Sequence, residues 1–108
     1  MNYPACGVFR RDGKWVIAFG NTKGDTLASE LDISCDDEGF RAFHRLLEEH
    51  IEQNRGNPPG IVRLQVFPNV LVSWTWEGFQ DVFRLVSARV KQLDLGKPIP
   101  DSDHVSWD

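Results

Sequence analysis

The sequence predicts an α+β two-layer sandwich, with a roughly five-stranded, mainly antiparallel sheet and two helices on one of its faces. An Asp12-Gly13 pair between two apolar-rich runs predicts a β-hairpin. Two amphipathic segments open on the same tripeptide, Glu38-Gly39-Phe40 and Glu77-Gly78-Phe79, and each follows alternating, strand-like residues. The resulting order of strand, strand, strand, helix, strand, strand, helix is typical of this class.

The first hairpin has a predictable register. A two-residue turn at Asp12-Gly13 pairs Phe9 with Val16 and Val8 with Ile17. Paired residues share a face of the sheet, so both faces of this hairpin are apolar. One face holds Cys6, Val8, Ile17 and Phe19, and the other holds Gly7, Phe9, Val16 and Ala18.

The next segment predicts a half-buried strand over residues 27–33, which alternates and carries Ser29 as the polar member of its inner side. Ser34, followed by Asp37, then predicts a helix start at which the hydroxyl caps free amides. Residues at helical spacing form the apolar stripe of this helix: Phe40, Phe43, Leu47 and Ile51. The Pro- and Gly-rich residues 54–60 end it.

The second half repeats this layout. Residues 62–66 and 70–76 alternate as strands, and their apolar sets share a face only if the connection at 67–69 has an odd number of residues. A second helix follows almost directly, and the tail 96–108 is expected to be extended, with Trp107 pinning it to the body. The predicted core consists of Ile17, Phe40, Phe43, Leu47, Leu64, Val72, Trp74, Phe79, Phe83 and Val86.

The two helical segments suggest an internal duplication. Residues 38–51 and 77–90 share five identities at an offset of 39 residues, which predicts repeat units over 15–55 and 61–95 within one domain, 1–108.

Composition and charge restrict the function. A chain of 108 residues with 41% hydrophobic and 26% charged residues is typical of one folded domain with a modest core. It has no apolar run long enough to cross a bilayer and no secretory signal pattern, so a soluble, cytoplasmic protein is expected. The net charge is −4, and residues 25–54 alone carry nine acids against two arginines, so binding to nucleic acid is not expected.

The residues that bear chemistry do not form a known catalytic or metal-binding pattern. Cys6 and Cys35 lack the spacing of a metal site or a redox pair. His44 and Glu48 stand one helical turn apart but supply two metal ligands at most, and His50 lies on the other side of the apolar stripe. We therefore expect no metal, cofactor or disulfide, and a protein that is not an enzyme.

These observations favour a protein–protein interaction module, such as an inhibitor, an immunity-type protein or an adaptor. Its expected partner-binding residues are Phe9, Val16 and Leu71 on the apolar sheet face and Glu48, Glu49 and Glu52 on an acidic helix. The partner is expected to be a protein, and the acidic helix favours a basic one. An apolar face or a free edge strand also predicts a homodimer. The alternative is that the tail, through Val105 and Trp107, covers the apolar face.

Two further functions remain open at this point. A pocket between sheet and helices, lined by His44, Trp74 and Trp76, predicts a small-molecule-binding protein. A weaker alternative is an enzyme whose site forms across a dimer interface, with His44 as its base.

Overall fold

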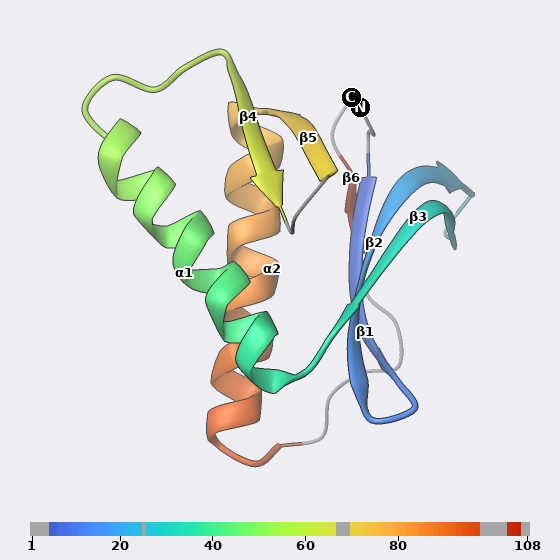
Figure 1. The fold of residues 1–108 in the computed structure, drawn as a ribbon. Helices are drawn as coiled ribbons and strands as arrows, with labels where there is room; N and C mark the ends of the chain where they lie inside the picture. The colour runs from blue at the N-terminus through green and yellow to red at the C-terminus, as the bar shows by residue number, and fades with distance from the viewer. Residues whose placement is uncertain (1–4, 25, 67–69, 98–103, 107–108) are drawn as a thin grey trace.

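Two helices and two antiparallel sheets make up the protein in its computed structural model, which describes residues 5–24, 26–66, 70–97 and 104–106 (Figure 1). The α+β class is confirmed, and so is the order of the first seven elements. In chain order the elements are β1 (Ala5–Arg11), β2 (Lys14–Lys23), β3 (Thr26–Cys35), α1 (Asp37–Asn54), β4 (Ile61–Val66), β5 (Val70–Thr75), α2 (Trp76–Asp94) and β6 (His104–Ser106).

The strands divide between two sheets, which differs from the single sheet expected. One sheet has the order β3-β2-β1-β6, and β4 pairs with β5 in a separate two-stranded sheet. Hairpin signals in a sequence specify only the pairing of neighbouring strands, and they do not say whether two hairpins join. Part of the predicted tail, β6, pairs with β1 at the sheet edge, while Trp107 lies outside the described residues.

The β1–β2 hairpin has the predicted register. Phe9 lies opposite Val16, and Val8 lies opposite Ile17. Asp12 and Gly13 have φ angles of 54° and 77°, as a two-residue type I′ turn requires. The turn chemistry therefore decides which side chains of both strands face the helices.

Strand β3 contains an irregularity that the alternation did not predict. Phe19 pairs with Leu31 but Gly20 pairs with Ser29, so Glu30 is an extra residue, as in a β-bulge. The bulge moves Ser29 off the inner face, where it was expected, and its exposed hydroxyl donates to Asp32 instead. Gly20 permits this close approach, because a Cβ there would lie 2.0 Å from the Ala28 carbonyl oxygen.

The two helices begin in the same way, 39 residues apart. Asp36 caps α1 by accepting from the amide of Gly39 at 2.7 Å, and Thr75 caps α2 by accepting from the amide of Gly78 at 3.0 Å. The expected cap, Ser34, is instead a strand residue opposite Val16, because β3 stays paired through Cys35. The matching caps agree with the proposed duplication, which itself stays a prediction.

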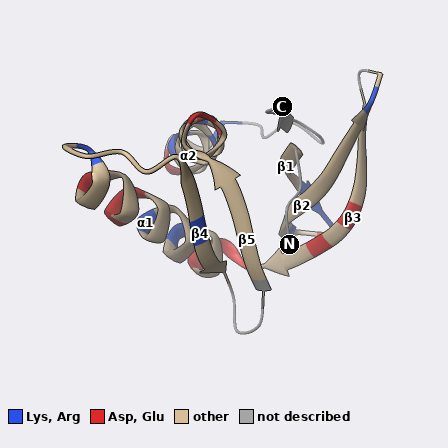
Figure 2. Cartoon of the chain, turned by 90° about the horizontal axis from the view of Figure 1, so that it is seen from above, with Lys and Arg blue, Asp and Glu red and all other residues tan. Residues whose placement is uncertain are grey.

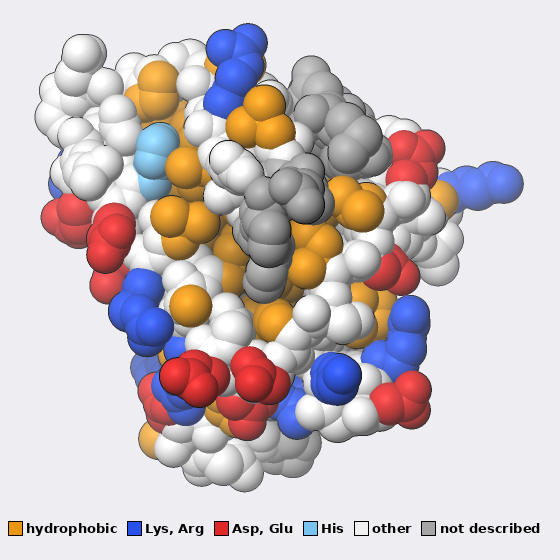
Figure 3. Space-filling view, in the orientation of Figure 1, with side chains coloured by type: hydrophobic (Ala, Val, Ile, Leu, Met, Phe, Trp, Pro, Cys, Tyr) orange, Lys and Arg blue, Asp and Glu red, His pale blue; other side chains and the backbone are white. Residues whose placement is uncertain are grey.

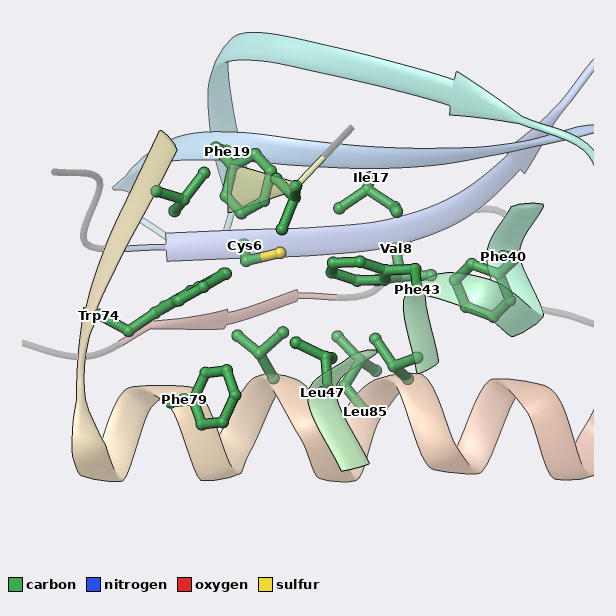
Figure 4. Packing of buried hydrophobic residues seen from close by; sticks show 14 of the residues in the cluster. Cys6, Val8, Ile17, Phe19, Phe40, Phe43, Leu47, Trp74, Phe79 and Leu85 are labelled. Atoms are coloured by element: carbon green, nitrogen blue, oxygen red, sulfur yellow. The ribbon is translucent and has the colours of Figure 1, made fainter. Parts of the chain in front are cut away.

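The core lies between the four-stranded sheet and both helices (Figure 4). Eight of the ten predicted core residues are buried, whereas Leu64 and Phe83 are partly buried at its margin. Strands β4 and β5 contribute Val62, Val72 and Trp74, with Val62 opposite Trp74. Val66 pairs with Val70, so the connection between them has the odd length that places both apolar sets on one face.

We predict that Gly20→Ala destabilises the fold by about 3 kcal/mol, since the added methyl group meets backbone and not a flexible side chain. Urea unfolding followed by circular dichroism measures the change. Gly56→Ala is the matched control, because a Cβ at Gly56 meets nothing within 4 Å. Equal stability of the two variants would contradict the role assigned to Gly20.

Candidate functional site

The acidic residues of α1 fall into two groups at opposite ends of the helix (Figure 2). Asp36, Asp37 and Glu38 lie at its start, where the positive end of the helix dipole favours carboxylates. Glu48, Glu49 and Glu52 lie in its C-terminal half. The two groups differ in the partners of their carboxylates, and this difference distinguishes the acids that stabilise the fold from those that are candidates for function.

The acids at the start of α1 stabilise the fold. Asp36 is the N-cap, and one oxygen of Asp37 accepts from Arg10 Nη1 at 2.7 Å and from Trp15 Nε1 at 2.8 Å. The hydrogen bond from Arg10 is the main reason why the pKa of Asp37 lies below its usual value, and the bond from Trp15 acts in the same direction. These carboxylates are engaged within the chain.

The acids in the C-terminal half have no comparable structural role. Glu48, Glu49 and Glu52 are exposed and lie outside the buried stripe of the helix, and the last turn of α1 carries no basic residue. Glu52 pairs with Arg55 at 2.7 Å, but both side chains are more than half exposed, so the pair contributes little. Of the three, only Glu52 lies in the last turn of α1, where the negative end of the helix dipole disfavours a carboxylate. We call these three residues the acidic face.

The predicted apolar sheet face does not form one open surface. Val16 is 2% exposed and Ala18 is fully buried, so the expectation that both lie on an open surface was wrong. Phe9 is half-buried beneath the guanidinium of Arg11, 5.0 Å from its ring centre. Leu71 lies on the other sheet. Alternation identified the face of each residue but carried no information about what lies over that face.

Two exposed apolar side chains lie at opposite ends of the outer face of the β4–β5 hairpin. Leu71 is 50% exposed and Ile61 is 49% exposed, and both point away from the core-facing Val62 and Val72. Sequence reasoning missed Ile61, although its odd position in the alternation around Val62 and Leu64 marks it as outward.

The three residues of the predicted pocket have separate environments. Trp74 is fully buried and packs between Phe19 and Phe79. His44 bridges the helices, because its Nε2 lies 2.9 Å from Ser87 Oγ and its ring stacks on Phe83. Trp76, at the first turn of α2, lies elsewhere, against a groove.

This groove is lined by residues from the C-terminal end of α1, from the segment that follows it and from the N-terminal half of α2. It has a volume of about 280 Å³. Its apolar side chains are Ile51, Pro58, Trp76 and Phe83, and its polar ones are Arg55, Gln80 and Arg84. No motif marked it, since these residues come from separate segments that resemble ordinary helix surface.

The cysteines are poorly suited to thiolate chemistry. Burial raises the pKa of Cys6 far above its usual value. Burial, reinforced by Asp36 and Asp37, raises the pKa of Cys35 to about 11. Both are therefore neutral thiols near pH 7.

Within the described ranges, no three His, Cys, Asp or Glu side chains come together as metal ligands, and the ring of His50 instead contacts the ring of Phe79 edge-on.

Neither described helix is long and apolar enough to cross a membrane. Comparisons with protein-family models, curated proteins and solved structures found no match to this chain.

We predict that the Asp37 carboxylate makes stability depend on pH. Its pKa is lowered on folding, so its contribution is present above the unfolded-state pKa and is lost as pH falls through the folded-state pKa. The wild type should therefore lose up to about 1 kcal/mol more stability than Asp37→Asn between about pH 6 and about pH 2. Denaturant unfolding at both pH values measures this difference, with Asp12→Asn in the exposed turn as control. A loss of the same size in wild type and Asp37→Asn would contradict the assignment.

Proposed function

We propose that this protein is a non-enzymatic interaction module whose acidic face, Glu48, Glu49 and Glu52, binds a basic protein partner. The observation that carries the proposal is the grouping of three exposed carboxylates in the C-terminal half of α1, with Glu52 in the last turn, where the helix dipole disfavours a carboxylate. Departures from local consistency in a folded sequence are expected at functional sites. An inhibitor, an immunity-type protein or an adaptor has this kind of interaction.

The charge distribution supports a basic partner. Residues 25–54 carry nine of the sixteen acids in the chain, and the space-filling view shows a group of acidic side chains at the left edge of the molecule, with Lys or Arg side chains below it (Figure 3). Opposite charge on a partner accelerates association and orients the encounter more than it strengthens the final complex. The acidic face therefore supports rapid, salt-sensitive recognition.

The surroundings of the reactive side chains agree with a non-enzymatic role. His44 joins α1 to α2 through Ser87 and Phe83, and both cysteines have raised pKa values. A catalytic histidine–serine pair usually has a third group that orients the imidazole. We therefore interpret the bond between His44 and Ser87 as a contact that holds the helices together.

The direct test is capture of a partner on immobilised protein at low and high salt. The variant Glu48→Gln/Glu49→Gln/Glu52→Gln should lose the partner that the wild type retains at low salt. A variant with the same change in net charge, Asp12→Asn/Glu30→Gln/Glu77→Gln, should retain it, because these exposed acids lie outside the acidic face. A partner that binds all three proteins equally would reject the acidic face as its site.

We predict that removing the acidic face does not destabilise the protein. The triple glutamine variant should be as stable as wild type or more stable by about 1 kcal/mol. Loss of the weak ion pair between Glu52 and Arg55 is offset, because the variant also removes the repulsion between the Glu52 carboxylate and the negative end of the helix dipole. Asp36→Ala should instead cost about 1 kcal/mol, since it removes the N-cap. Thermal or urea unfolding compares them. Marked destabilisation of the triple variant would show that these acids serve the fold.

We also propose self-association through the outer face of the β4–β5 hairpin, where Ile61 and Leu71 are exposed. Sedimentation equilibrium should show a dimer at micromolar concentration, and Ile61→Asp/Leu71→Asp should yield a monomer with unchanged circular dichroism. Leu95→Asp is the control, because Leu95 is similarly exposed but follows α2. A monomeric wild type would contradict the proposed dimer, but it would not affect the proposal for the acidic face.

A further inference from the structure

We propose that the groove between α1 and α2 binds a small planar aromatic carboxylate. This inference goes beyond the proposed protein partner, and it is argued from the side chains that line the groove and not from the acidic face. The groove combines an aromatic and aliphatic lining with two guanidinium groups and an amide, and few polar groups around an apolar floor are the usual composition of a small-molecule site.

The apolar part of the groove favours a flat ring. Trp76 and Phe83 of α2 lie on one helix, and Ile51 lies on the other. Trp76 is only partly buried and packs against Phe79, with ring centres 6.0 Å apart, so its ring is supported by the core. The volume of about 280 Å³ lies just below the usual range of small-molecule sites, which restricts the ligand to one or two rings.

The polar part favours a carboxylate. Arg55 directly follows α1 and Arg84 lies on α2, so the two sides of the groove each carry one cation. Their present partners are Glu52 and Asp81, each within one helical turn and at 2.7 Å. The Arg55 and Arg84 side chains are 68% and 70% exposed, and such surface pairs are weak. An incoming carboxylate can therefore compete for the guanidinium groups, which bind carboxylates with two parallel hydrogen bonds.

Gln80 adds an amide that can form a hydrogen bond with either an acceptor or a donor of the ligand, since it has both a carbonyl oxygen and an NH₂ group. The two arginines can only donate. These three polar side chains therefore favour a carboxylate over the corresponding amide because of its charge. A preference for the acid would distinguish specific binding from non-specific contact with exposed aromatic rings.

The test is titration of the isotope-labelled full chain with naphthalene-2-carboxylate, followed by two-dimensional NMR. We expect saturable shifts of the Trp76 indole signal and of the amides at Arg55, Gln80 and Arg84, with a Kd of about 1 mM. Naphthalene-2-carboxamide, which has the same shape without the charge, should bind about tenfold more weakly.

Variants assign the effect to the groove. Arg55→Gln and Arg84→Gln should each weaken binding of the carboxylate about threefold and leave binding of the carboxamide unchanged. Arg63→Gln is the matched control, because Arg63 is exposed on β4 and does not line the groove. All three arginines are exposed, so we expect each variant to fold. Equal binding of acid and amide, shifts remote from the groove, or lack of saturation by about ten times the expected Kd would overturn the proposal.

Discussion

The position of α1 on the sheet depends on one junction, in which the ring of Trp15 stacks on Phe40 with centres 4.0 Å apart and an angle of 6°. The Trp15 indole donates to Asp37 at 2.8 Å, and Asp37 also binds Arg10, whose guanidinium lies 5.0 Å from the centre of the Trp15 ring. Strands β1 and β2 and the first turn of α1 are thus joined by stacking, a cation–π contact and shared hydrogen bonds. This junction fixes the N-terminal end of α1, and with it the direction in which its exposed side points.

Local chemistry explains why much of the fold could be predicted from the sequence. The Asp12-Gly13 turn determined the register of β1 and β2, and the helical spacing of Phe40, Phe43 and Leu47 identified the buried side of α1. The division into two sheets could not be predicted in this way, because it depends on contacts between segments far apart in the chain. The bulge opposite Gly20 was missed for another reason: alternation assumes that every residue of a strand has one partner.

The candidate sites show the same limit. The acids of α1 were evident from composition, but separating Asp36 and Asp37 from the acidic face required the helix ends and the partners of each carboxylate. The groove was not foreseen, since its side chains become neighbours only when α1 and α2 pack together.

The ion pair between Glu52 and Arg55 lies where the two surfaces meet, because Glu52 belongs to the acidic face and Arg55 lines the groove. A ligand that engages Arg55 would release Glu52, so occupancy of the groove would alter the charge presented by the acidic face.

The bulge in β3 also affects how this protein meets other copies of itself. Among the described strands β3 is at the edge of its sheet, with one row of backbone groups not paired to another strand. A flat edge of ten residues is a template for uncontrolled strand addition and fibril growth. The extra residue Glu30 interrupts the regular spacing of those backbone groups, and it places a negative charge beside Asp32 on the same short stretch. The bulge that requires glycine at position 20 thus also makes this edge a poor site for aggregation.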